Sequence, residues 1–149
     1  MKTYILMLSK YFPSSHHKSG LETGFKEKLL NGKKIHTIRA NYPLWKNRIS
    51  RVQKGEAIIS IRQWEGKPYR SKQIEVKILR KEDGVGIEKI TLPPTGELAT
   101  VLKSFVKLDE NDGLTLLDWM NWFEHYERNK PMAIIHFTPF RYYQNNEQN

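Results

Sequence analysis

The sequence predicts an α+β fold in which a small mixed β-barrel carries two or three helices over its openings. Residues 57–64 read AIISIRQW, a run rich in β-branched and apolar residues that is typical of a strand. The turn residues at 65–68 separate this run from a second arm at 69–79, in which apolar and charged residues mostly alternate. Helical patterns lie between the predicted strands, and no internal repeat is visible. Short strands with helices between them are typical of the α+β class.

The first half of the chain is expected to contain two more strands and one helix. Residues 3–9 form a mostly apolar run that predicts a buried strand. Apolar residues recur every four positions within 21–31, which predicts a helix that ends at Gly32. A strand is predicted over 35–40. Residues 41–55 are expected to be irregular, because they carry turn-forming residues near both ends.

The second half predicts two short strands and two helices. Residues 87–92 favour a strand, and residues 97–106 favour a helix with apolar residues on one side. Thr115 is a suitable N-cap for an aromatic-rich helix. Residues 132–140 are expected to form the last strand. The polar tail at 144–149 is expected to fray.

Composition excludes several classes of site. The 149 residues suit one domain, with its core between about residues 21 and 140. Cysteine is absent, which excludes disulfides, thiol nucleophiles, zinc fingers and iron–sulfur clusters. The five histidines include no pair at i, i+4 spacing, so neither a metal site nor a cofactor is expected. No apolar run reaches the roughly 18 residues of a membrane span. With no recognisable leader, a cytoplasmic protein without membrane contact is expected.

The charge of the chain is unevenly distributed. The formal net charge is +9, yet residues 1–80 hold 18 basic and 5 acidic residues, whereas residues 81–149 hold 7 and 11. Such asymmetry favours one face that binds a polyanion. The alternative is a basic protein whose lysines are simply solvated.

Aromatic residues lie among the basic ones between residues 45 and 72. Interleaved aromatic and basic side chains suit base stacking and phosphate contacts on single-stranded nucleic acid. The alternative is that Trp45 and Trp64 fill the core. The residues predicted to bind nucleic acid are Lys33, Arg39, Trp45, Arg62, Trp64 and Lys72.

Four features in order resemble the ASCH domain family, a relative of the PUA fold. The run GKKIHTIR at 32–39 matches the pattern Gly-x-Lys-x-x-Thr-x-Arg after a helix. Gly55 and Glu56 precede the strand at 57–64, and DGLT at 112–115 precedes an aromatic-rich helix. A closing apolar strand follows at 132–137. The resemblance covers about residues 21–140 and implies a PUA-like barrel that binds RNA or nucleotides in a cleft.

Small members of that family include amidohydrolases that remove the acetyl group from N(4)-acetylcytidine, using a Lys, a Thr and a Glu. By position, the resemblance assigns these roles to Lys34, Thr37 and Asp112, with Glu110 as a possible substitute for the shortened acid. The chemistry is consistent, because a neutral Lys can deprotonate a Thr hydroxyl. Burial and positive neighbours, here Lys33 and Arg39, would lower the pKa of Lys34.

Strand geometry constrains this hypothesis. Thr37 and Arg39 must share one face of their strand, so Lys34 has to lie on the turn before it. Each residue also has an ordinary interpretation: Lys34 as a solvated lysine, Thr37 as a β-branched strand residue and Asp112 as a turn residue. The binding module is the preferred hypothesis, the amidohydrolase is the alternative, and a protein-interaction domain is the third.

Overall fold

The structure is a computed structural model of the whole chain, and it describes residues 1–94 and 98–143. The predicted tail at 144–149 and the start of the predicted helix at 97–106 lie outside the described residues.

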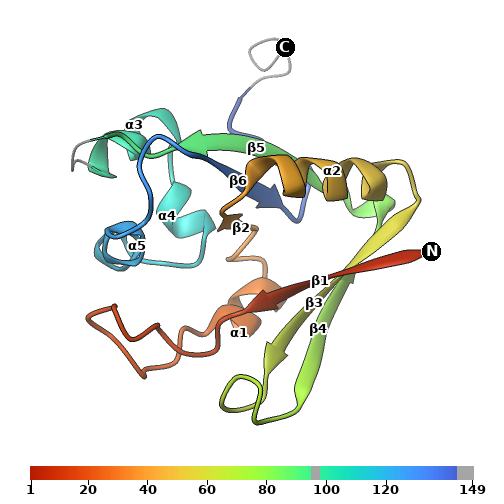
Figure 1. Cartoon of the computed structure of the whole chain (residues 1–149), viewed down its shortest axis with the longest axis horizontal. Coiled ribbons are helices and arrows are strands. Elements are labelled where there is room, and N and C mark those ends of the chain that lie inside the picture. Colours follow the sequence, from red (N-terminus) through yellow and green to blue (C-terminus); the bar gives the residue numbers. More distant parts are fainter. Residues whose placement is uncertain (95–97, 144–149) are drawn as a thin grey trace.

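The first sheet contains the N-terminal strand and the predicted hairpin. It is formed by β1 (Lys2–Leu8), β3 (Ala57–Trp64) and β4 (Gln73–Leu79) in the order β1-β3-β4 (Figure 1). Strands β1 and β3 are parallel, whereas β3 and β4 are antiparallel with a register shift between Ile61 and Arg62. One edge of β1 pairs with β3. On its other edge, the carbonyl of Met7 accepts a hydrogen bond from Arg39.

The second sheet has the last strand at its centre. It is formed by β2 (His36–Arg39), β5 (Gly86–Thr91) and β6 (Pro131–His136) in the antiparallel order β2-β6-β5. Both neighbouring side chains Ile134 and Ile135 on β6 are fully buried, which is expected for a central strand covered on both faces.

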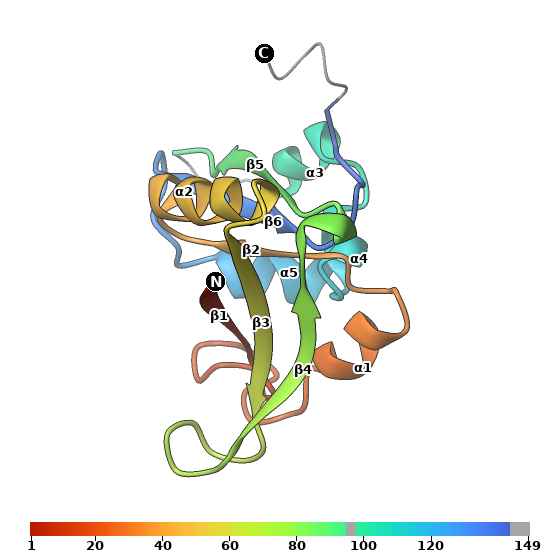
Figure 2. The ribbon, with the colours of Figure 1, turned by 90° about the vertical axis from the view of Figure 1, so that its right-hand side faces the viewer.

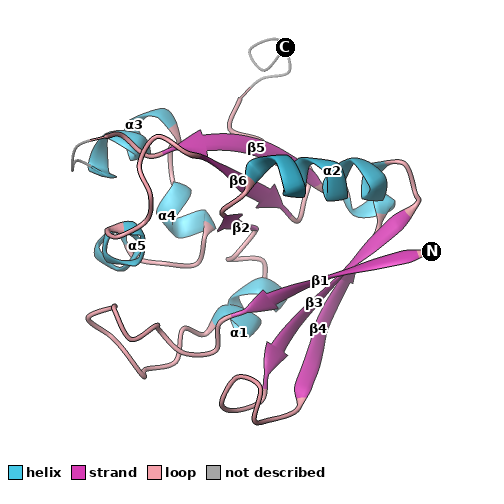
Figure 3. Ribbon diagram, viewed as in Figure 1, coloured by secondary structure: helices cyan, strands magenta, loops and turns pink. Residues whose placement is uncertain are grey.

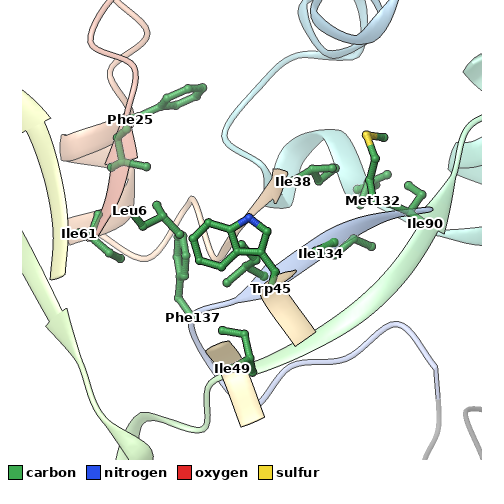
Figure 4. Close-up of a cluster of buried hydrophobic side chains, with 14 of the residues drawn as sticks. Leu6, Phe25, Ile38, Trp45, Ile49, Ile61, Ile90, Met132, Ile134 and Phe137 are labelled. Atoms are coloured by element: carbon green, nitrogen blue, oxygen red, sulfur yellow. The ribbon is translucent and has the colours of Figure 1, made fainter. Parts of the chain in front are cut away.

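The predicted α+β class is confirmed, but the closure of the barrel is not. Among the described residues, the strand ladders form two separate three-stranded sheets, and no ladder joins them into a ring. The apolar side chains of both sheets pack into one hydrophobic cluster (Figure 4). Helix α2 (Tyr42–Gln53) contacts β3 of the first sheet and β5 and β6 of the second, so it bridges them.

The prediction that residues 41–55 are irregular is wrong, because they form helix α2. Asn41 adopts a left-handed backbone (φ 66°) and its side chain accepts a hydrogen bond from the Leu44 amide, which caps the helix. Pro43 lies in the first turn, where a missing N–H costs nothing. Trp45, Ile49 and Val52 then form a buried face at i, i+4, i+7 spacing.

The other helices are short, and those between β5 and β6 gather on one side of the molecule (Figure 3). Helix α1 (Phe25–Leu30) is shorter than predicted, and Leu21 lies exposed before it. Helices α3 (Val101–Ser104), α4 (Leu108–Asn111) and α5 (Leu116–Phe123) lie between β5 and β6 in the chain. Figure 2 shows α4 and α5 behind the β2 strand, with α1 below them. Two 3₁₀ turns complete the described elements, at Lys81–Asp83 and Leu98–Thr100.

Several predicted bounds shift by a few residues. The arm predicted at 69–79 pairs only from Gln73, and the strand predicted at 132–140 ends at His136 because the chain turns before Pro139. Thr115 caps α5 as predicted and accepts a hydrogen bond from the Asp118 amide. No helix among the described residues is long and apolar enough to cross a membrane.

A buried polar pair fixes the C-terminal segment on the second sheet. The Nε2 of His136 lies 2.7 Å from Glu88 Oε1, and both side chains are fully buried. Glu88 also accepts hydrogen bonds from the backbone amides of Tyr142 and Tyr143. Burial lowers the pKa of His136 to about 4, so the neutral imidazole is the native form.

We therefore expect the free energy of unfolding to fall as the pH is lowered. The unfolded chain protonates His136 near its ordinary pKa of about 6.5, whereas the folded chain resists protonation. The contribution of His136 to the free energy of unfolding is fully present above the unfolded-state pKa. It is lost as the pH falls toward the folded-state pKa of about 4. Between about pH 7 and about pH 5 the loss from this residue is about 2 kcal/mol. Urea denaturation at both pH values measures it.

The matched variants are His136→Gln and His125→Gln. The first should reduce the pH dependence, because glutamine does not titrate, whereas the second changes an exposed histidine and should leave it unaltered. An unchanged pH dependence in His136→Gln would contradict the assignment.

Candidate functional site

A narrow pocket opens between the end of β1, helix α1, strand β2 and helix α5. Its volume is about 100 Å³. Its aromatic walls come from α1 and from α5 with the turn after it, namely Phe25, Trp122, Phe123 and Tyr126. The polar groups in it are Ser9, Lys34, Thr37, Arg39 and Asp112. The three predicted catalytic residues therefore share one pocket with Arg39.

The turn after α1 brings Lys34 into the pocket. Gly32 takes a left-handed backbone with φ +82°, and the amides of Lys33 and Lys34 both donate to the carbonyl of Lys28. Ile35 then donates to the Asn111 carbonyl, which joins this turn to the end of α4. Lys34 consequently lies before β2, as the alternation of strand side chains requires.

Lys34 and Asp112 form a buried ion pair. The Nζ of Lys34 lies 2.8 Å from Asp112 Oδ1 and 2.7 Å from the Asp112 carbonyl oxygen. Only 2% and 5% of the two side chains are exposed, so water screens their attraction little. The ring of Phe25 lies 4.1 Å below Nζ and adds a cation–π contact.

Thr37 and Arg39 occupy the same face of β2, as predicted. The Nε of Arg39 donates to Thr37 Oγ1 at 3.3 Å, and its Nη2 donates to the carbonyl of Met7 on the free edge of β1. Arg39 thereby connects the two sheets and keeps a guanidinium beside the Thr37 hydroxyl. Neither Asp112 nor Glu110 forms an ion pair with Arg39 among the described residues.

Burial controls the protonation of the pair. Burial lowers the pKa of Lys34 against the opposing effect of Asp112, and Arg39 and Lys28 lower it further. Burial alone would raise the pKa of Asp112, but Lys34 and His36 hold it below its ordinary value. The site thus contains a lysine that loses its proton more easily than usual beside a carboxylate that stays ionised.

Asn111, Tyr142 and His36 form a hydrogen-bonded series behind Asp112, and the final contact from His36 to Asp112 is longer than a hydrogen bond. The Asn111 side-chain amide donates to Tyr142 Oη at 3.0 Å, so the hydroxyl hydrogen of Tyr142 is directed to His36 Nε2 at 2.5 Å. The neutral His36 ring then carries its hydrogen on Nδ1, which lies 3.6 Å from Asp112 Oδ1. Burial lowers the pKa of His36, which is consistent with a neutral ring. Nothing in the sequence pattern pointed to this role of His36.

The remaining predicted residues lie elsewhere. Glu110 is exposed and lines a separate surface cavity together with Lys33, so it does not replace Asp112 in the pocket. Trp45 packs in the core against residues of both sheets, which its apolar helix face explains (Figure 4). Of its two predicted roles, core filling is the one observed.

Arg62, Trp64 and Lys72 lie on the β3–β4 hairpin. Arg62 donates to Ser60 Oγ and to Gln73 within its own sheet. Trp64 packs at 5.2 Å against Tyr69, whose side chain is the more exposed. The six predicted nucleic-acid residues therefore do not line one basic cleft.

A polar cluster fastens the loop before α1 to α5. The Nε2 atoms of His16 and His17 lie 2.9 Å from the Asp118 carbonyl and carboxylate oxygens, and Lys18 Nζ lies 2.7 Å from the other carboxylate oxygen. These groups are close enough to hold a metal ion. However, the Nδ1 of His16 accepts from the Lys18 amide and the ammonium already neutralises Asp118. Each of these side chains thus has a hydrogen-bond or ion-pair partner within the protein, which indicates a structural role.

Comparisons of the chain with protein-family models, with curated proteins and with solved structures find no match. The resemblance to the ASCH family therefore remains a prediction, and the function is inferred from the geometry of the site.

Gly113 offers a test of how tightly the site is packed. Its φ of +82° disfavours any side chain, and an added Cβ would lie 3.2 Å from Lys34 Cβ. Gly113→Ala should lower the free energy of unfolding by about 2 kcal/mol or more, as measured in urea. Gly20→Ala is the matched control, because Gly20 has φ +83° and no atom within 4 Å of the added Cβ. An equal loss of unfolding free energy in both variants would show that the contact with Lys34 does not contribute to the destabilisation.

Proposed function

We propose that this protein is an amidohydrolase that removes a small acyl group from the exocyclic amine of a nucleoside, with N(4)-acetylcytidine as the test substrate. The observation that supports it is the presence of Lys34, Thr37 and Asp112 in one narrow pocket beside Arg39. A hydroxyl, a base of lowered pKa and a carboxylate are the groups that acyl transfer from nitrogen needs. The resemblance to the ASCH family supplies the choice of substrate, and a PUA-like fold is part of the same proposal.

In the first step, Thr37 Oγ attacks the acyl carbonyl carbon. Its proton passes to Lys34 Nζ in those molecules in which Lys34 is neutral, a fraction that burial of the ammonium increases. The carbonyl oxygen becomes an oxyanion. The guanidinium of Arg39, which lies beside the Thr37 hydroxyl, stabilises that charge.

In the second step, the C–N bond breaks and the amine leaves. The Lys34 ammonium returns its proton to the departing nitrogen, and Asp112 stabilises the ammonium until then. Thr37 is left as an acyl ester. A water molecule, deprotonated by Lys34, attacks the ester and releases the carboxylic acid, and the proton returns to Thr37.

A second candidate function, binding of single-stranded RNA, rests on a different surface. The tip of the β3–β4 hairpin projects from the body of the molecule (Figure 2). Tyr69 at this tip is 89% exposed and packs against Trp64. Three exposed cations lie close to these two aromatic residues in the sequence, namely Lys67, Arg70 and Lys72. An exposed aromatic ring among cations is the arrangement that stacks on bases and contacts phosphates.

The enzyme proposal predicts that Thr37→Val abolishes release of cytidine from N(4)-acetylcytidine, whereas Thr37→Ser retains part of it. Valine has the shape of threonine without its hydroxyl, and removal of a nucleophile costs at least about a hundredfold in rate. The rate should also rise with pH as Lys34 loses its proton. Hydrolysis by Thr37→Val at the wild-type rate would reject Thr37 as the nucleophile.

Lys34 requires a paired substitution. Lys34→Ala alone leaves the Asp112 carboxylate buried without its partner, which typically costs about 3–5 kcal/mol and would confuse unfolding with loss of catalysis. The double variant Lys34→Met with Asp112→Asn removes both charges. It should unfold at a similar urea concentration to the wild type and show at least about a hundredfold less activity. Full activity in this folded variant would reject the pair as catalytic.

The RNA proposal predicts that Tyr69→Ala weakens binding of a single-stranded oligonucleotide by about tenfold, because base–aromatic stacking contributes about 1–3 kcal/mol. Fluorescence anisotropy at two salt concentrations measures it, and affinity should fall steeply with salt. Tyr11→Ala is the control, since Tyr11 is exposed beside a single lysine. Equal effects of the two variants would show that binding is not specific to the hairpin.

A further inference from the structure

A second cavity lies next to the narrow pocket and is much larger. Its volume is about 640 Å³, against about 100 Å³ for the pocket that holds Lys34 and Thr37. Tyr126 lines both cavities. The larger volume is in the range of small-molecule binding sites, which are about 300–1,000 Å³.

Two stretches of chain form walls of both cavities. Thr37, Ile38 and Arg39 line the narrow pocket, and the next two residues, Ala40 and Asn41, line the large cavity. On the opposite side, Trp122 and Phe123 line the narrow pocket, and the chain continues from there to His125 and Glu127 in the large cavity. The two cavities are therefore neighbours, with Tyr126 as a shared wall.

The lining of the large cavity indicates the chemistry of the molecule that it suits. Pro43, Pro131, Met132 and the ring of Tyr126 offer apolar surfaces, which suit a flat ring. The two charged residues, Glu127 and Lys130, form an ion pair at 2.8 Å and neutralise each other. The residues that line the cavity thus carry no excess positive charge for a phosphate.

We infer that the large cavity binds the amine half of the substrate, a neutral heteroaromatic nucleoside without a phosphate, while the narrow pocket holds only its acyl group. This inference rests on the proposed function, because it places the acyl carbonyl at Thr37 in the narrow pocket and the amine on the side of Tyr126, which lines both cavities. It also assigns a separate role to each cavity. The volume of the narrow pocket limits the size of the acyl group, and the large cavity determines which amine binds.

Cytidine tests this inference without catalysis, because it carries the amine half and no acyl group. Ala40 lines the large cavity, is exposed and does not line the narrow pocket, so Ala40→Trp fills the cavity and leaves the catalytic groups in place. Ala99 is also exposed and lines neither cavity, so Ala99→Trp is the matched control. Both variants are first checked for folding by urea denaturation.

Titration calorimetry with cytidine should show binding to the wild type and to Ala99→Trp, and at least about tenfold weaker binding to Ala40→Trp. The KM for N(4)-acetylcytidine should rise by a similar factor in Ala40→Trp alone. Cytidine monophosphate should bind no more tightly than cytidine. Absence of cytidine binding by the wild type, equal binding by Ala40→Trp, or tighter binding of the monophosphate would each overturn the inference.

The outcome separates this inference from the proposed function. Weakened cytidine binding in Ala40→Trp supports the nucleoside cavity even where no acetyl group is released, and then only the hydrolase proposal fails. Release of cytidine with an unchanged KM in Ala40→Trp leaves the hydrolase standing and overturns the cavity.

Discussion

The buried ion pair between Lys34 and Asp112 is the constraint on which the rest of the site depends. Moving two charges out of water costs several kcal/mol for each, and only close contact with further hydrogen bonds offsets that cost. The turn after α1, the start of β2 and the end of α4 must therefore meet within hydrogen-bond distance. The bond from Ile35 to Asn111 and the second contact of Lys34 to the Asp112 carbonyl hold them there. Gly113, which has no side chain, leaves the room that Lys34 needs.

The basic residues in the first half of the chain do not all lie free on the surface. Lys34 and Arg39 are directed into the narrow pocket, where their partners are Asp112, Thr37 and the Met7 carbonyl. Arg48 packs over the rings of Tyr4 and Trp45, and Arg62 bonds within its own sheet. Exposed cations lie near aromatic rings in more than one place, since Lys46 and Lys89 lie over the ring of Tyr42 and the cations of the hairpin tip are close in sequence to Trp64 and Tyr69. The basic residues thus divide into a few that have partners inside the molecule and others that are exposed.

Local signals in the sequence were enough to predict some features, whereas others depend on tertiary packing. The glycine turn and the alternation of strand side chains predicted that Lys34 precedes β2 and that Thr37 and Arg39 share a face. Asp112 lies 78 residues from Lys34, so only the resemblance to a family linked them. Helix α2 was missed because turn-forming residues outweighed the spacing of Trp45, Ile49 and Val52. Tyr126 and the second cavity were beyond prediction, since they arise where two distant segments come together.

Stability does not explain why a lysine and an aspartate occupy this position. A hydrophobic pair of similar volume is often as stable as a buried ion pair, or more stable. The same pocket is lined by the buried apolar residues Phe25, Leu114 and Phe123. The pair instead leaves Lys34 with a lowered pKa in a pocket that also contains the Thr37 hydroxyl and the Arg39 guanidinium. Such an arrangement has a cost in folding and an advantage in proton transfer, because a lysine that loses its proton readily can accept one from Thr37. The balance of these two effects is the physical reason to look for chemistry, rather than binding alone, at this site.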